Sequence, residues 1–80
     1  MPQAVRSFPL RRSTPSPVEE ERKLLQQELS RTRVLTNQAY SCFNSARDDE
    51  LIESYVYEIN ALQARYNYLL RRLKHLEGAL

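Results

Sequence analysis

The sequence predicts an all-α protein, a two-helix antiparallel hairpin with a disordered N-terminal tail. Three observations predict it. All four prolines fall in the first 17 residues, the rest of the chain carries two segments with apolar residues at helical spacing, and a short polar stretch separates the two. Because the chain has 80 residues, it holds at most one domain, and a core of that size barely offsets the entropy of ordering the chain. A partner or self-association is therefore expected.

The tail comprises residues 1–17 and is rich in proline, arginine and serine. Its prolines each remove a backbone donor and bias the preceding residue away from helix. Arg6, Arg11 and Arg12 lie here without a single acidic residue. An organellar transit peptide has a similar composition, but the spaced prolines oppose the amphipathic helix that such a peptide needs. We expect a solvated arm.

The hairpin domain covers residues 18–77, and its first helix should run from about residue 18 to about residue 43. Glu19 to Glu21 open this helix, where the macrodipole favours negative charge. One face of the helix carries an apolar stripe in which two threonines are included. The stripe consists of Leu24, Leu25, Leu29, Thr32, Leu35, Thr36, Ala39, Cys42 and Phe43. Cys42 is accordingly interpreted as a small core residue.

The turn is predicted at residues 44–48, and the second helix at about residues 49–76. Asp48 is the expected N-cap, since its carboxylate can accept amide hydrogens of the first turn, and Gly78 is a plausible C-terminal stop. This helix also carries an inner apolar stripe. Its members are Leu51, Ile52, Tyr55, Ile59, Leu62, Tyr66, Leu69, Leu70, Leu73 and Leu76.

A short link makes the helices fold back antiparallel, which predicts a pairing of residues. Small residues of the first helix then meet large ones of the second. The predicted pairs are Phe43 with Ile52, Ala39 with Tyr55, Leu35 with Ile59, Thr32 with Leu62, Leu29 with Tyr66 and Leu25 with Leu69. The same fold brings Glu19 to Glu21 toward the basic residues at the end of the second helix.

A second line of residues lies opposite the inner stripe of the second helix. Tyr57, Ala61, Ala64 and Tyr68 recur at helical spacing, with Arg65 beside them. The alanines would let another helix approach closely while the tyrosines supply contact area. The alternative is that these tyrosines simply lie along a solvated surface. We favour an interface, because the domain is too small to stand comfortably alone.

The segment "DDELIESYVYEINALQARYNYLLRRLK", with "FNSA" shortly before it, resembles the YaaL-like family of small bacterial cytosolic proteins of unknown function. The resemblance covers Tyr40 to Lys74. The matching positions are Phe43, Asn44, Asp48, Leu51, Ile52, Tyr57, Glu58, Asn60, Ala61, Arg65, Tyr66, Asn67, Tyr68, Leu69 and Leu70. Asp49 departs from the family, which usually has proline there. The resemblance implies a two-helix protein without known catalysis and adds no active site; whether Asn60 and Asn67 are buried stays open.

Catalysis, a metal site and a cofactor are not expected. The only histidine, His75, should lie about 30 Å from Cys42 at 1.5 Å per residue, so the two cannot form a nucleophile and base within one chain. One histidine and one cysteine do not make a zinc site, and a single glycine leaves no loop to cradle phosphate. We therefore expect no enzyme and no small-molecule substrate.

The expected location is the cytoplasm. No apolar run approaches the roughly 18 residues that cross a bilayer, and the N-terminus lacks the apolar region of a signal peptide. A lone cysteine excludes an internal disulfide and suits a reducing compartment. We expect no membrane contact.

Two function hypotheses follow. The first is a helical protein-interaction module that self-associates or docks on a protein partner through the tyrosine and alanine line. The alternative is a weak nucleic-acid-binding accessory protein. Its phosphate contacts would come from Arg11, Arg12, Arg71, Arg72 and Lys74. Interleaved acidic residues on the second helix oppose this alternative.

Overall fold

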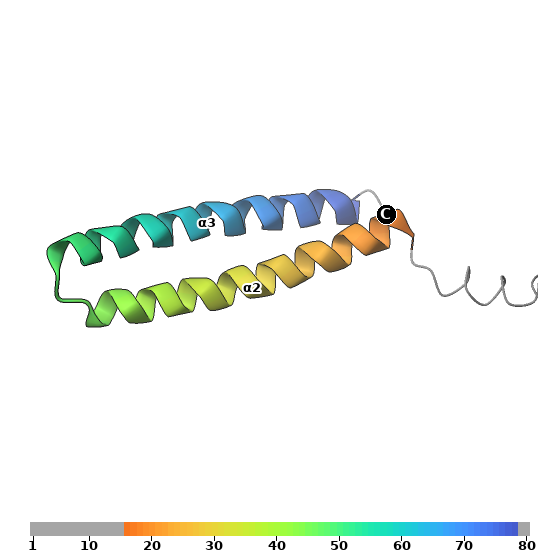
Figure 1. Cartoon of the computed structure of the whole chain (residues 1–80). Coiled ribbons are helices and arrows are strands. Elements are labelled where there is room, and N and C mark those ends of the chain that lie inside the picture. Colours follow the sequence, from red (N-terminus) through yellow and green to blue (C-terminus); the bar gives the residue numbers. More distant parts are fainter. Residues whose placement is uncertain (1–15, 79–80) are drawn as a thin grey trace, which may run out of the picture.

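The structure, a computed structural model, describes residues 16–78, which form a hairpin of two long helices (Figure 1). Helix α2 runs Pro17–Ser45 and helix α3 runs Asp49–Gly78. The end of α3 lies beside the start of α2, so the helices are antiparallel (Figure 1). The predicted fold class is confirmed. The tail was predicted to be disordered over residues 1–17, and residues 1–15 of it lie outside the described part of the chain.

Helix α2 begins at Pro17 because Ser16 caps it. The Ser16 hydroxyl accepts a hydrogen bond from the amide of Glu19 at 3.2 Å, and the Glu19 carboxylate accepts one from the amide of Ser16 at 3.3 Å. This reciprocal pair is a capping box, and proline at the first helical position suits it because its missing amide hydrogen would have no partner there. The cap places the helix start one residue before the predicted one.

The turn is shorter than predicted and consists of residues 46–48. Asp48 ends it, and its Oδ1 accepts a hydrogen bond from the amide of Leu51 at 3.1 Å while its carbonyl accepts one from Ile52 at 2.9 Å. These bonds confirm Asp48 as the N-cap of α3. At the other end, α3 continues past residue 76, where the helix was predicted to end, and includes Gly78, whose φ is not positive. A left-handed glycine therefore does not terminate the described helix.

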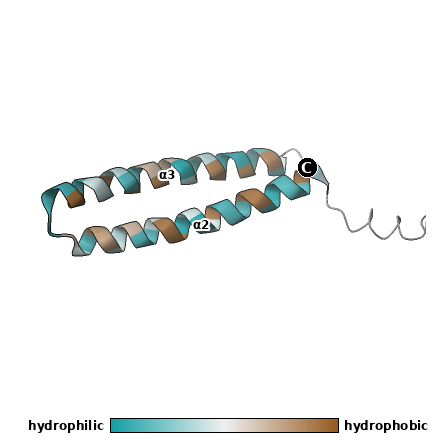
Figure 2. Ribbon diagram, in the orientation of Figure 1, coloured by the Kyte–Doolittle hydropathy of each residue, from teal (hydrophilic) through white to brown (hydrophobic). Residues whose placement is uncertain are grey.

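The core lies between the two helices and is one side chain thick. Ala39, Ile59 and Leu62 form a buried cluster, against which Leu35 and Phe43 pack. Hydrophobic and hydrophilic residues alternate along both ribbons (Figure 2), which is the pattern of helices that bury only one face. The cluster contains Leu35 and Ile59, one of the predicted pairs, and it joins Ala39 to Ile59 and Leu62, whereas Ala39 was predicted opposite Tyr55.

The remaining buried residues continue the core toward the open end of the hairpin. They are Leu29 and Thr32 of α2, and Leu69 and Leu76 of α3. Thr32 is only 1% exposed, yet its hydroxyl is satisfied because it donates to the carbonyl of Glu28 at 2.7 Å. A small side chain at this position lets the helices stay close without an unpaired polar group.

Three residues predicted for the inner stripes are exposed instead. Leu24 is 56% exposed, Leu51 is 45% exposed, and Cys42 is also exposed. Leu24 and Cys42 lie on the same margin of α2, since they are separated by about five full turns. One neighbouring helix covers a narrower arc than the apolar stripe, so residues at the margin stay in contact with solvent. The interpretation of Cys42 as a core residue is therefore wrong.

Candidate interaction surface

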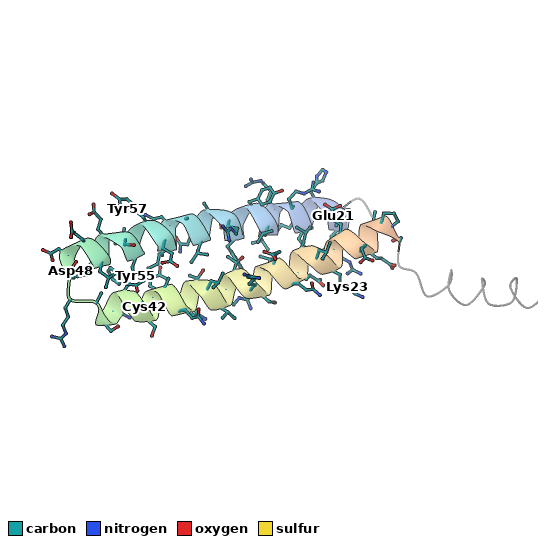
Figure 3. The ribbon with its side chains drawn as sticks, viewed as in Figure 1. Glu21, Lys23, Cys42, Asp48, Tyr55 and Tyr57 are labelled. Atoms are coloured by element: carbon teal, nitrogen blue, oxygen red, sulfur yellow. The ribbon has the colours of Figure 1, made fainter. Side chains whose placement is uncertain are left out.

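The surface of α3 that faces away from α2 carries the four residues singled out in the sequence. We call Tyr57, Ala61, Ala64 and Tyr68 the outer face. All four are exposed, Tyr57 by 65% and Tyr68 by 50%. Figure 3 shows Tyr57 on the side of α3 opposite to α2. Among residues 16–78, nothing packs against this side of α3, so within the described hairpin the outer face is accessible to another molecule.

The polar surroundings of the outer face are simple. The Tyr57 hydroxyl donates a hydrogen bond to Oε2 of Glu53 at 3.3 Å, one turn earlier on the same helix. Arg65 is exposed beside the alanines. Asn60 and Asn67 are also exposed, which answers the question left open by the sequence. Neither asparagine therefore fixes the register of the hairpin from within its core.

The basic residues proposed as phosphate contacts are not brought together as one free patch. Arg72 is partly buried and its guanidinium forms an ion pair with the carboxylate of Glu21 across the two helices. This pair confirms that the acidic start of α2 meets the basic end of α3. Arg71 and Lys74 are exposed. The predicted contacts Arg11 and Arg12 lie outside the described residues.

A cleft opens on one side of the hairpin between α2 and α3, and three of its lining side chains are amides. It has a volume of about 420 Å³ and is lined by Arg33, Thr36, Asn37, Gln63, Tyr66 and Asn67. Within it, Arg33 donates a hydrogen bond to the Tyr66 hydroxyl at 3.4 Å. This cleft could not be predicted from the sequence, because both helices contribute to its wall and no local motif indicates it. Tyr66, which was predicted to pack in the core, supplies the polar tip at its rim.

Cys42 has a specific neighbour in Tyr55 (Figure 3). A hydrogen bond between the two side chains is the main cause that raises the pKa of the Tyr55 hydroxyl above its ordinary value. Repulsion from the Cys42 charge, partial burial and the nearby Glu58 carboxylate raise this pKa further. Cys42 therefore lies beside α3 although its side chain is exposed.

A family model matches residues 9–77 of the chain, and that family is described as "Protein of unknown function (DUF2508)". The match covers most of the sequence. The chain belongs to this family. No curated protein and no solved structure matches it.

The DUF2508 match includes both helices of the hairpin almost completely. It is longer than the resemblance noted in the sequence, which was confined to Tyr40 to Lys74, and it reaches into the proline-rich segment that was placed outside that resemblance. The family therefore corresponds to the hairpin as one unit, with α2 as well as α3.

Residues 16–78 contain no cluster of three or more histidine, cysteine or acidic side chains that could hold a metal ion. Neither described helix has a stretch apolar enough to cross a membrane.

Proposed function

We propose that this DUF2508 protein is a non-catalytic helical interaction module that self-associates through the outer face of α3. The observation that supports it most is the pair of exposed tyrosines, 65% and 50% accessible, on a helix surface that the described residues leave uncovered. Between them, Ala61 and Ala64 leave the backbone accessible to another helix. Tyrosine is enriched at interfaces because it combines a large apolar ring with a polar tip.

The size of the core also supports the proposal. The hairpin buries side chains between only two helices, and domains of this size usually gain stability from a partner. Two hairpins that associate would form a four-helix arrangement with coiled-coil-like packing.

Two finer statements belong to the same proposal. We propose that the chain is a member of the YaaL-like group, because of the motifs in α3, and that it resides in the bacterial cytoplasm, because a lone cysteine suits a reducing compartment.

A nucleic-acid-binding role is the second candidate. Exposed Arg71 and Lys74 favour it, whereas the engagement of Arg72 with Glu21 removes one of its expected phosphate contacts. Binding of single-stranded DNA or RNA that weakens with salt would support it. We rank it below self-association because the exposed acids of α3 interrupt the basic surface.

The test is the solution mass of the full chain against concentration, measured by sedimentation equilibrium. The wild type should pass from monomer to dimer, and Ala61→Glu should stay monomeric, since a charged side chain would be buried between the helices. Gln38→Glu is the matched control. It makes the same change of charge at an exposed position of α2 and should leave the dimer intact.

Circular dichroism on the same samples separates association from folding. Ala61 is exposed in the single hairpin, so Ala61→Glu should retain the helicity of the wild-type monomer. A wild type that is monomeric at all concentrations would refute self-association. A dimer that survives Ala61→Glu would place the contact on another surface.

A further inference from the structure

We propose that the second copy packs α3 against α3 in antiparallel orientation, about a twofold axis that passes between Leu62 and Gln63. This inference rests on the proposed function and specifies the partner and its register. It follows from the order of residues along the exposed surface of α3, in which the side-chain sizes are symmetric about that point and the charges on its two sides have opposite sign.

The sizes of the side chains repeat in reverse order on the two sides of the axis. Tyr57 and Tyr68 lie equally far from the point between Leu62 and Gln63, and so do Ala61 and Ala64. In a twofold interface a residue that contacts a second position is itself contacted from that position in the other copy. An antiparallel pair therefore places Tyr57 opposite Tyr68 of the second copy, and Ala61 opposite Ala64 of the second copy.

The packing that results is sterically reasonable. Two helices that cross approach most closely at the crossing point and diverge away from it. The small alanines lie next to the axis, where the space is least. The tyrosines lie about one and a half turns away, where diverging helices leave room for rings. Both tyrosines are at least half exposed in the single hairpin and are free to fill that room.

The charges on the same surface make the orientation antiparallel. Along α3, Glu50 and Glu53 precede the outer face, and Arg71 and His75 follow it. All four residues continue the spacing of three or four residues of the outer face, and all four are exposed. A parallel pair would place acid against acid and base against base. The antiparallel pair places Glu50 at the level of His75 of the second copy and brings Glu53 within one residue of the level of Arg71. The antiparallel pair also orients the two helix dipoles in opposite directions, which is the favourable arrangement for neighbouring helices.

Distances between spin labels test this register without altering the interface. In a Cys42→Ser background, cysteines are introduced singly by Val56→Cys, Gln63→Cys and Lys74→Cys, on exposed positions along one flank of α3. At 1.5 Å per residue, the antiparallel register separates equivalent labels along the axis by about 2 Å at position 63, about 20 Å at position 56 and about 35 Å at position 74. Pulsed electron resonance on the dimer measures these distances.

The outcomes separate the register from the self-association itself. A distance that is shortest at position 63 and increases in both directions supports the proposal. Three similar short distances would mean parallel helices and would overturn it, while sedimentation still shows a dimer. Absence of any measurable distance in a sample that sediments as a monomer would overturn both the register and the proposed function.

A charge reversal provides an independent test. Glu53→Lys alone and Arg71→Glu alone should each weaken the dimer several-fold, because symmetry introduces two like-charge contacts. The double variant should restore association close to the wild-type level. A double variant in which the two losses simply accumulate would contradict the antiparallel contact. Helicity measured at low concentration checks that each variant still folds.

Discussion

The half of the hairpin next to the turn and the half at its open end are held together differently. Next to the turn, the helices are joined by a link of three residues and by the cluster of Ala39, Ile59 and Leu62. Toward the open end, two arginines also bridge the helices, Arg33 to the Tyr66 hydroxyl and Arg72 to the Glu21 carboxylate.

The difference indicates how the chain specifies a single register. The turn and the apolar cluster bring the helices together, but apolar contacts alone tolerate a slip along the helix axis. The two side chains of a polar pair far from the turn can meet only when the helices pack in one register. Such a pair contributes little free energy, since exposed ion pairs are screened, but it is sensitive to misalignment. Substitutions in the two halves of the hairpin should therefore differ in their cost.

Leu62→Ala should have the largest effect, a loss of about 3 kcal/mol of unfolding free energy, because it opens a cavity in the cluster. Leu69→Ala removes a leucine of equal exposure, 6%, from the open half, and should cost about 2 kcal/mol, because the end of the hairpin can relax around it. Leu24→Ala is the matched control and should change the unfolding free energy much less, because Leu24 is 56% exposed. Urea unfolding followed by circular dichroism measures all three. Equal losses at positions 62 and 69 would remove the distinction between the halves.

Asp48→Ala should destabilise the hairpin by about 1 kcal/mol, because the amide of Leu51 loses its acceptor at the start of α3. Ser16→Ala removes the cap of α2 at the open end and should cost about half as much, since a terminal turn can fray without opening the core. Thermal unfolding compares the two variants. A larger loss for Ser16→Ala would show that the open end, and not the turn, limits stability.

The pair of Glu21 and Arg72 should contribute about 0.5 kcal/mol, because its side chains are 42% and 39% exposed. A double-mutant cycle with Glu21→Gln and Arg72→Gln isolates this coupling energy. The coupling should decrease between low and high salt. A coupling that salt leaves unchanged would mean that the pair acts by packing and not by charge.

The smallest effect is expected in the titration of Tyr55, near the turn. The pKa of its hydroxyl is raised, so Tyr55 should ionise above about pH 10. A group whose pKa is raised in the folded state stabilises the fold below its ordinary pKa, and this contribution is lost as the pH rises through the folded value. Absorbance of tyrosinate measures the titration. Tyr55→Phe should lose tyrosinate absorbance above about pH 10, and Cys42→Ala should shift that absorbance to lower pH. If the curve of Tyr55→Phe were unchanged above this pH, the absorbance there would belong to another tyrosine.

Most of the fold could be predicted from local patterns. The apolar spacing gave both helices to within two residues at each end, and Asp48 was identified as a cap because its chemistry acts on neighbouring amides. The outer face was predicted from α3 alone, as a line of residues opposite the buried stripe. The capping box at Ser16 was missed, although its spacing to Glu19 is visible in the sequence.

The exposure of Leu24, Cys42 and Leu51 could not be predicted in the same way. Helical periodicity reports which residues share a side, but the width of the buried arc depends on how many helices cover that side. The cleft beside Arg33 and Tyr66 depends likewise on the relative position of two helices.

Local sequence patterns were sufficient for the two helices, for a turn between them and for the exposed line of Tyr57, Ala61, Ala64 and Tyr68. These features depend on dihedral preferences, caps and periodicity, which act within a few residues along the chain. The packing of the two helices set the rest: which margins of the stripes are buried, which of the basic residues at the end of α3 pairs with Glu21, and that Cys42 lies beside Tyr55. Those contacts join residues far apart in the chain, and their geometry follows from how closely and at what register one helix packs on the other.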